Sequence, residues 1–493
     1  MAFWNGHLYR NSEGQSVTHP RATTPITNLP ITLERDTATP LAVQLAETIR
    51  TAAADGVLRA GDRLPSTRAL AAELGVSRTV TAAAYDQLHA EGWIDGKHGS
   101  GTYVTTTPPR GIPHGRVSGQ GRGEREYIDL APGAPLIEDM DRAAWRRAWR
   151  AAADEEPLLR PVRAGLPEYR EVIAEHLLRH RGLSVAPARI AEVVLATAGT
   201  TAAVNELACA VFEPGDVLAM EDPGYQRAVQ VLRSAGVRVV PVPVDEGGVR
   251  VDEIDPAAKA VYCSPSHQYP LGGRMTASRR VQLVERARER GWLVIEDDYD
   301  GELRYDVAPL PLLASLAPDV VVHLGTTSKI FTSTLGAGWM IAPQQVTGKV
   351  LDYRERTGVA PAAAGQQVLV QLARNGDLGR HLRKIRRVLH QRRELVVHTL
   401  RAAGADVLGD DAGAHVVVPL EDLEREDAVV HGAREQGIWI DGLARHHIGT
   451  QQWHGVALGY TACTHAELEQ ALPVVAGLLK RCGYAGSPGG RGH

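Results

Sequence analysis

The chain has 493 residues, of which 44% are hydrophobic and 23% charged, and this composition is typical of a globular protein with roughly two or three cores. Its 54 Lys and Arg residues against 58 Asp and Glu give a net charge of −4, which excludes nucleic-acid binding through bulk positive charge. Four widely spaced cysteines without a CxxC pair exclude a disulfide scaffold, and we expect no metal site. No signal peptide and no membrane span are predicted, so we expect a cytoplasmic protein without a membrane partner.

Residues 1–35 are polar and rich in Pro and Thr, and they predict a flexible N-terminal arm. Residues 36–107 predict a small domain of three helices followed by a β-hairpin. Its first helix is indicated by Leu41, Leu45 and Ile49, which recur every four residues and form one apolar face.

A helix-turn-helix pattern follows this first helix. Ser66 is a candidate N-cap for the second helix, Gly75 supplies the tight turn, and Ser77 is a candidate N-cap for the third helix. The N-terminal end of such a third helix is where a recognition helix contacts base edges. We expect the third helix to bury Val80, Ala84 and Leu88 and to expose Arg78, Thr79, Thr81 and Ala82.

A two-stranded wing is predicted after the third helix, from Trp93-Ile94 and Thr102–Val104, with Lys97 and Gly99 at its tip. A generic three-helix domain is the alternative, because residues 36–107 are not basic overall. The run GVLRAGDRLPSTRALAAELGVSRTVTAAAYDQLHAEG, followed by GSGTYV, resembles the winged-helix domain of the GntR family over its whole length. The resemblance implies binding to double-stranded DNA, which combines phosphate and base-edge contacts. The implied DNA contacts are Ser66, Arg68, Ser77, Arg78, Thr79, Lys97 and Gly99.

Residues 108–127 predict a linker, because the stretch 105–126 holds five Gly, three Pro and four Arg and only two aliphatic residues. Its arginines are compatible with a simple spacer and with a further contact to DNA. Residues 128–484 alternate β-branched runs with helical patterns, which predicts an α/β domain with a largely parallel sheet, and residues 485–493 predict a disordered tail. The strand candidates are VVLAT (193–197), DVLAM (216–220), VRVVPV (237–242), AVYCS (260–264), LVIED (293–297) and VVVHLG (320–325).

Lys329 follows the last of these runs, so it lies at the carboxyl end of a strand, where open parallel sheets bind ligands. A buried lysine there can lose its proton and form a Schiff base with an aldehyde, although most lysines after strands are ordinary loop cations. The turn after VVLAT predicts a phosphate site, because Gly199 and Thr200 present free backbone N–H groups at the start of a helix. The hydroxyls of Thr326 and Ser328, next to the lysine, can donate to the same phosphate.

Asp297 and Tyr225 complete the candidate site. Asp297 ends the run LVIED, and a carboxylate there can hold a protonated pyridine nitrogen. Tyr225, in EDPGY, offers a ring face for stacking. The alternatives are a solvated turn carboxylate for Asp297, which lies in an acidic run, and a half-buried tyrosine at a sheet edge for Tyr225.

The segment YCSPSHQYPLGGRMTASRRVQLVERARERGWLVIEDDYDGELRY, followed by GTTSK, resembles the effector domain of MocR-type regulators. Those proteins join a GntR winged helix by a long linker to a fold type I, pyridoxal phosphate-dependent aminotransferase fold, and the resemblance covers nearly all of Thr39–Leu479. It implies a homodimer in which Lys329 forms the Schiff base with pyridoxal phosphate. The implied cofactor contacts are Gly199, Thr200, Tyr225, His267, Asp297, Tyr299, Thr326, Ser328 and Lys329, and the implied contacts for an effector carboxylate are Arg227 and Arg445.

Four features depart from the family pattern at the cofactor or the ligand carboxylate, one of them the segment 159–163, which reads LRPVR where the family usually has Tyr-Gly-Asp-Pro before GLP. Gly336 and Ala457 stand where the family usually has arginines, and Thr201 stands where it usually has glutamine. A charge-assisted hydrogen bond to phosphate contributes about 1.5–3 kcal/mol, so the departures weaken the expected binding of pyridoxal phosphate. They also make an ordinary α-amino acid a less favoured effector.

The function favoured by the sequence is a transcription regulator that reads two operator half-sites as a homodimer. Its large domain is expected to sense pyridoxal phosphate, or an amine-bearing metabolite, with Lys329 serving sensing rather than turnover. One alternative is a regulator whose degenerate pocket no longer binds the cofactor and senses another ligand. The other is an active aminotransferase, which Ala457 disfavours because that enzyme must grip two substrates.

Overall fold

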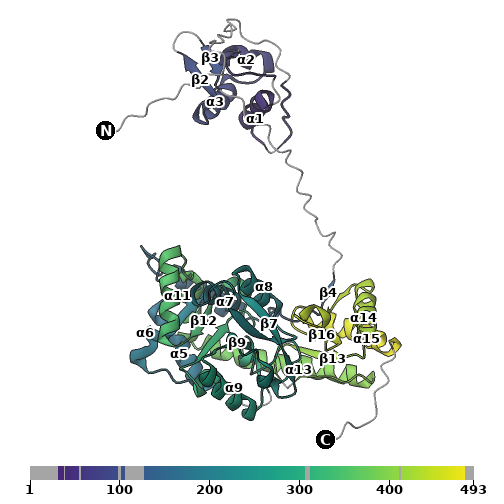
Figure 1. Ribbon diagram of the computed structural model, residues 1–493. Helices are drawn as coiled ribbons and strands as arrows, with labels where there is room; N and C mark the ends of the chain where they lie inside the picture. Colours follow the sequence, from purple (N-terminus) through teal and green to yellow (C-terminus); the bar gives the residue numbers. More distant parts are fainter. Residues whose placement is uncertain are drawn as a thin grey trace, which may run out of the picture. The chain divides into compact units, whose positions relative to one another are not determined.

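The computed structural model describes residues 31–37, 39–54, 57–97, 101–105, 127–305, 311–409 and 412–482. The chain divides into two compact units, Met1–Gly123 and Glu124–His493, called here the small and the large unit (Figure 1). Most of the expected arm and linker, and the expected tail, lie outside the described residues. Within these ranges no helix has the length and apolar character needed to span a membrane, and no cluster of His, Cys, Asp and Glu is arranged to hold a metal ion.

The small unit is a winged helix-turn-helix, as the sequence predicts. Its core is formed by the apolar faces of its three helices, with Leu45, Leu70 and Leu88 fully buried. Ser66 caps the second helix by accepting a hydrogen bond from the Ala69 N–H at 3.1 Å, and Gly75 ends that helix with a left-handed φ of 64°. The elements are α1 Leu41–Ala54, β1 Arg63–Leu64, α2 Thr67–Leu74, α3 Arg78–Ala90, β2 Ile94–Lys97 and β3 Gly101–Val104.

Thr81 departs from the sequence prediction, because it is buried rather than exposed. Its hydroxyl lies 2.8 Å from the carbonyl oxygen of Thr67 and 3.0 Å from that of Arg78, and it donates to these acceptors. A buried hydroxyl needs a hydrogen-bond partner, and the first turn of α2 supplies one. Thr81 therefore fastens the start of α3 to the start of α2. Val80, expected in the core, is only partly buried.

The large unit is built on an eight-stranded sheet with the order β5-β12-β11-β10-β9-β6-β7-β8. The strands from β11 to β7 in this order pair in parallel, whereas β12 and β8 run antiparallel to their neighbours. The prediction of a largely parallel sheet is therefore confirmed. The strands are β5 Val194–Thr197, β6 Val217–Asp222, β7 Arg238–Asp245, β8 Gly248–Val249, β9 Ala258–Cys263, β10 Leu293–Asp298, β11 Val321–Thr326 and β12 Gly338–Ile341.

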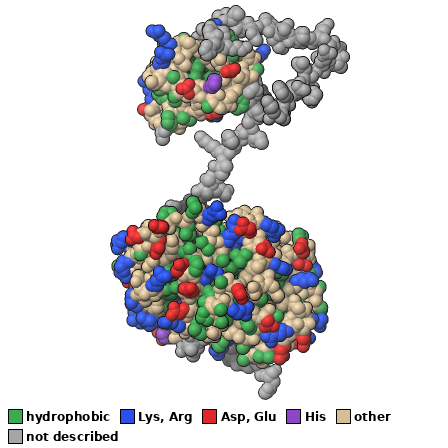
Figure 2. Space-filling view, turned by 90° about the vertical axis from the view of Figure 1, so that its left-hand side faces the viewer, with side chains coloured by type: hydrophobic (Ala, Val, Ile, Leu, Met, Phe, Trp, Pro, Cys, Tyr) green, Lys and Arg blue, Asp and Glu red, His purple; other side chains and the backbone are tan. Residues whose placement is uncertain are grey.

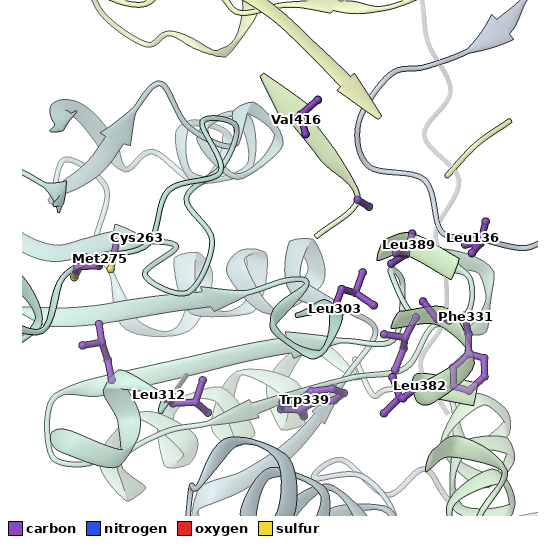
Figure 3. Packing of buried hydrophobic residues seen from close by; sticks show 14 of the residues in the cluster. Leu136, Cys263, Met275, Leu303, Leu312, Phe331, Trp339, Leu382, Leu389 and Val416 are labelled. Atoms are coloured by element: carbon purple, nitrogen blue, oxygen red, sulfur yellow. The ribbon is translucent and has the colours of Figure 1, made fainter. Parts of the chain in front are cut away.

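Helices cover both faces of this sheet, because successive side chains of its strands point to opposite sides. Val294 packs into one apolar cluster and Ile295 into the other. The cluster of Ile295 includes residues of α7, α8 and α11, and the larger cluster of Val294 includes residues of α5, α9, α12 and α13; Figure 3 shows part of the larger cluster around Cys263, Met275 and Trp339. The helices are α4 Arg142–Ala153, α5 Pro167–Arg181, α6 Ile190–Val193, α7 Thr200–Val211, α8 Gln226–Ser234, α9 Ala277–Arg290, α10 Leu313–Leu316, α11 Gln344–Thr357, α12 Ala363–Arg374, α13 Asp377–Ala402, α14 Leu423–Glu435 and α15 His465–Arg481.

A second, smaller group of strands forms what we call the C-terminal lobe, residues 412–482 together with β4 (Figure 1). Its antiparallel sheet has the order β13-β16-β15, and β4 pairs in parallel with β14. The first strand of the large unit thus pairs with a strand more than 300 residues further along the chain. The strands are β4 Ile128–Asp129, β13 His415–Pro419, β14 Ile438–Trp439, β15 Asp441–Gly442 and β16 Gly455–Gly459.

Candidate functional sites

The exposed side chains predicted to contact DNA gather at the N-terminal ends of α2 and α3. Ser66 and Arg68 lie at the start of α2, and both are exposed. Ser77, Arg78 and Thr79 lie at the start of α3, also exposed, with the Ser77 and Thr79 hydroxyl oxygens 2.6 Å apart. This hydroxyl pair takes the place of the side-chain cap that the sequence predicts for Ser77. The first turns of both helices therefore present hydroxyl and guanidinium donors to the surroundings.

The wing is a three-stranded sheet rather than the predicted two-stranded one. The added strand is β1, in which Arg63 pairs with Tyr103 of β3. A strand of two residues has no hydrophobic period, so the sequence pattern gave no signal for it. Lys97 ends β2 opposite Gly101, and Gly99 lies outside the described residues.

A cavity of about 570 Å³ lies in the large unit at the carboxyl ends of β5, β10 and β11. This is the place where open parallel sheets bind ligands. The sequence-predicted residues that line it are Gly199, Thr200, Tyr225, Arg227, Asp297, Tyr299, Thr326, Ser328, Lys329 and Arg445. Lining residues that sequence reasoning missed include Gly133, Tyr269, Asp300, His415, Asp441 and His446.

Lys329 occupies the turn directly after β11. Its Nζ donates a hydrogen bond to the carbonyl oxygen of Gly133. Burial lowers the pKa of Lys329, although the nearby carboxylates of Asp300 and Asp297 oppose this shift. Because the neutral amine is the nucleophilic form of lysine, the environment favours attack on an aldehyde.

Asp297 is 4% exposed, which excludes the alternative of a solvated turn carboxylate. Its Oδ2 accepts a hydrogen bond from the Tyr262 hydroxyl, while Oδ1 is buried and has no hydrogen-bond partner in the described part of the chain. Burial raises the pKa of Asp297 to about 7. A buried carboxylate oxygen without a partner is costly, so this atom is ready to accept a hydrogen bond from a ligand.

The turn between β5 and α7 forms a cup of small donors. Gly199 has a φ of 120°, and a Cβ built there would lie 3.4 Å from Thr326 Oγ1, which itself lies 2.8 Å from Ser328 Oγ. Thr200 Oγ1 is buried without a hydrogen-bond partner among the described residues. The Gly199 N–H donates to Thr197 Oγ1 at 3.3 Å, so it is not free as predicted. In α7, the N–H groups without an acceptor begin with that of Thr200, because the first turn of a helix has no intrahelical acceptor.

Two departures from the family pattern have local explanations. Thr201 Oγ1 lies 3.0 Å from the Tyr225 hydroxyl oxygen, so this threonine holds the tyrosine that borders the cavity. Tyr225 precedes α8 and is partly buried. Gly336 has a left-handed φ of 61°, and a Cβ there would meet no atom within 4 Å. An arginine at this position would have space but a strained backbone.

His267 does not line the cavity, although the resemblance implies a cofactor contact for it. Its Nδ1 lies 2.7 Å from Asp300 Oδ2 and 2.9 Å from the Tyr299 hydroxyl oxygen. The ring is buried and stands behind two residues that do face the cavity. His267 therefore acts in this structure as a support for Asp300 and Tyr299.

Arg445 lines the cavity, but its charge is already engaged. Its Nη1 donates to Asp441 Oδ1 at 2.7 Å. Ala457 is fully buried and stands opposite Asp441 in the pairing of β15 with β16. Asp441 follows the apolar run IWI, much as Asp297 ends the run LVIED, but this pattern alone does not place Asp441 beside the large sheet.

Comparisons with known proteins agree with this architecture. Residues 41–104 match the family of bacterial regulatory proteins, gntR family, and residues 125–474 match aminotransferase class I and II. The chain is 34% identical over 440 residues to the HTH-type pyridoxine biosynthesis transcriptional regulator PdxR of Corynebacterium glutamicum, which covers 88% of this chain and 95% of the relative. It is 32% identical over 456 residues to the probable rhizopine catabolism regulatory protein MocR of Rhizobium meliloti, covering 87% and 92%.

The chain belongs to the MocR-type transcriptional regulators. Solved structures confirm the fold of the large unit of this MocR-type regulator. An archaeal alanine:glyoxylate aminotransferase superposes with a TM-score of 0.67 at 24% identity, covering 73% of this chain and 92% of the enzyme. The kynurenine aminotransferase of Pyrococcus horikoshii gives 0.66 at 23% identity, with the same coverage. At these identities the likeness shows the fold alone, which is fold type I.

The cavity of this MocR-type regulator fits pyridoxal phosphate, the cofactor of the aminotransferase fold. Asp297 Oδ1 is an acceptor without a partner in the described residues, as a protonated ring nitrogen requires. The Thr200 hydroxyl and the backbone N–H groups at the start of α7 offer donors to a phosphate, and Gly199 presents no side chain beside them. Lys329 supplies the amine.

On the face of the large unit drawn in Figure 2, basic and acidic side chains are interspersed, in keeping with the nearly balanced charge.

Proposed function

We propose that this MocR-type regulator binds pyridoxal phosphate through Lys329, and that the state of this cavity controls operator binding by the winged helix. The observation that carries the proposal is the convergence of Lys329 and the unpartnered Asp297 Oδ1 in one cavity. The name of the relative from Corynebacterium glutamicum, a regulator of pyridoxine biosynthesis, also supports a role for pyridoxal phosphate in this chain.

Each residue of the cavity has a defined task in this proposal. Asp297 accepts the hydrogen bond of the ring nitrogen, and Tyr225 borders the ring. The backbone N–H groups at the start of α7 and the hydroxyls of Thr200 and Thr326 surround the phosphate. The N-terminus of a helix favours such a negative charge. Lys329 provides a neutral amine for covalent attachment. When bound, pyridoxal phosphate supplies an aldehyde that reacts with primary amines.

Sensing rather than turnover is the better use of this cavity. Transamination requires a grip on the carboxylate of each amino acid substrate, and Ala457, where the family usually has an arginine, provides none. Arg445, a possible replacement, lies on the carboxylate of Asp441. An amine-bearing metabolite that reacts with the bound cofactor then acts as the effector. It changes operator binding only if it favours one arrangement of the homodimer over another.

Cofactor binding is tested by the absorption spectrum of the full chain with added pyridoxal phosphate, compared with that of a Lys329→Ala variant. We expect a visible absorption band in the wild type and none in the variant. After borohydride reduction, mass spectrometry should find the cofactor attached to the wild type alone. The absence of attachment in the wild type would favour a degenerate pocket for another ligand, and steady conversion of amino acids to oxo acids would favour an active aminotransferase.

DNA binding is tested by measuring the operator affinity of an Arg78→Ala variant. The control is Arg288→Ala, which removes an exposed arginine of the large unit. Arg78 lies at the exposed start of α3, so we expect a loss of about 1–3 kcal/mol in operator binding. Arg288→Ala should leave the affinity unchanged. Equal losses in both variants would argue against base or phosphate contact by α3.

A further inference from the structure

The wall that the C-terminal lobe adds to the cavity carries a buried carboxylate with an exposed counter-ion. The side chain of Asp441 is 6% exposed, whereas that of its partner Arg445 is 60% exposed. Water surrounds most of the guanidinium, so it loses little when it moves away from Asp441. The carboxylate, in contrast, needs a cation or a donor at its buried position. The pair is therefore built for exchange of its cation.

In the described part of the chain, β16, the strand that pairs with β15, supplies Asp441 with no second positive charge. Ala457 faces it across the strand pair and carries only a methyl group. Burial raises the pKa of Asp441, Arg445 opposes this shift, and the nearby acid Asp129 adds to it. Among the described residues around it, Arg445 is thus the cation that stabilises this carboxylate.

His446 gives an independent sign of a ligand at this wall. Its imidazole is 2% exposed, it lines the cavity, and both of its ring nitrogens lack hydrogen-bond partners in the described residues. Its Nε2 lies 3.9 Å from Asp441 Oδ2, so the two groups border one space. Burial and the positive charge of Arg445 lower the pKa of His446 to about 3. The ring is therefore neutral at physiological pH and has one nitrogen that accepts a hydrogen bond.

Aromatic rings close this space. The ring of Tyr269 lies 5.2 Å from that of His446, nearly perpendicular to it. It also lies 6.1 Å from the ring of Tyr225 and 5.8 Å from that of Tyr299, and all three tyrosines line the cavity. Ring faces attract an ammonium or guanidinium group, and they offer nothing to a carboxylate.

We propose that Asp441 and His446 form a subsite for a second cationic group, so that the effector is a primary amine with an ammonium or guanidinium at its other end. The ligand cation takes the place of Arg445 on Asp441 and donates a hydrogen bond to His446. This inference rests on the proposed function, because the first amine of the ligand reacts with the cofactor near Lys329. A terminal carboxylate would instead meet the negative charge of Asp441.

The test uses three amines that differ only at the far end: 1,4-diaminobutane, 1-aminobutane and 4-aminobutanoate. Each is titrated into the cofactor-loaded full chain, and the shift of the visible band gives its affinity. We expect the diamine to bind about tenfold more tightly than 1-aminobutane, the effect of one charged hydrogen bond, and 4-aminobutanoate to bind most weakly. Tightest binding of 4-aminobutanoate, or equal binding of the diamine and 1-aminobutane, would overturn the subsite.

Two variants locate the effect. Asp441→Asn should remove the preference for the diamine, and Arg445→Gln should increase it several-fold, because the competing cation is gone. Asp319→Asn, at an exposed pair with Arg288, is the matched control and should keep the wild-type preference. A preference that survives Asp441→Asn, or falls in Arg445→Gln, contradicts the proposal. If the chain does not take up the cofactor, calorimetry with the same amines still tests the subsite, so the two failures are distinguishable.

Discussion

The cavity has two walls that hold buried polar groups differently. The sheet wall lies at the carboxyl ends of β5, β10 and β11, and the lobe wall belongs to the C-terminal lobe. The sheet wall leaves Asp297 Oδ1 and Thr200 Oγ1 buried without partners in the described chain, next to a lysine of lowered pKa. The lobe wall pairs its buried Asp441 with an arginine that is mostly in water. Groups held permanently without partners suit a resident cofactor, whereas an exchangeable pair suits a ligand that arrives and leaves.

The largest expected effect is at the sheet wall, in the Asp297→Asn variant of the cofactor-free chain. Burial raises the pKa of Asp297 from 3.8 to about 7, so the folded protein favours the protonated carboxyl. The unfolded chain loses this proton near pH 4, and stability therefore falls as the pH rises from about 4 to 7. The variant lacks this fall, and at pH 8 it should be more stable than the wild type by up to about 4 kcal/mol, at about 1.36 kcal/mol per pH unit.

Urea unfolding at pH 5 and pH 8 measures this difference, with Asp319→Asn as the control for an exposed carboxylate. Saturation with pyridoxal phosphate should reverse the order of the two proteins at pH 8, because the ring nitrogen gives Asp297 a partner. Parallel pH profiles for wild type and Asp297→Asn would show that Asp297 Oδ1 also has a partner in the cofactor-free protein.

A smaller effect is expected from Thr200→Val. The Thr200 hydroxyl is buried without a partner in the described residues, so its removal should stabilise the cofactor-free chain by about 1 kcal/mol. The same change should weaken pyridoxal phosphate binding about tenfold, because one donor to the phosphate is lost. Thr201→Val is the matched control, since it loses the hydrogen bond to Tyr225 and should lower stability instead. Thermal unfolding with and without cofactor separates these outcomes.

The smallest effect is expected at the lobe wall. Arg445→Gln should change the free energy of unfolding by less than about 1 kcal/mol, because the glutamine amide can still donate a hydrogen bond to the buried Asp441 and the lost charge was mostly exposed. The change should shrink further in 0.5 M salt, which screens exposed charges. A loss of several kcal/mol would mean that Arg445 is a fixed structural partner of Asp441, and the contrast between the walls would fail.

The sheet wall was predictable from the sequence because its residues lie at or just after the ends of strands. Lys329, Asp297 and Thr200 each stand where a β-branched run ends, and parallel strands bring such ends together. The alternation of strands and helices likewise predicted the mainly parallel sheet and the covering helices.

The lobe wall was not predictable in this way. Asp441 and His446 reach the cavity because the C-terminal lobe packs beside the large sheet, and no local period encodes that packing. Tyr269 lies in the motif SPSHQYP, yet the resemblance favoured His267, which stands behind the cavity. The buried Thr81 was missed for a similar reason, since its partner carbonyl belongs to another helix.

The pairing of β4 with β14 determines which part of the large unit the linker joins. Ile128 N–H donates to Gly437 O at 2.9 Å, and Leu130 N–H to Trp439 O at 2.8 Å. Asp441 follows this pairing after a single residue, Ile440. The chain that arrives from the winged helix is therefore anchored to the lobe that holds the exchangeable ion pair, and the linker enters the large unit through that lobe. If the proposed cation displaces the lobe, the displacement would reach Ile128–Leu130, the residues that follow the linker, through these backbone hydrogen bonds and that from Gly459 N–H to Leu130 O.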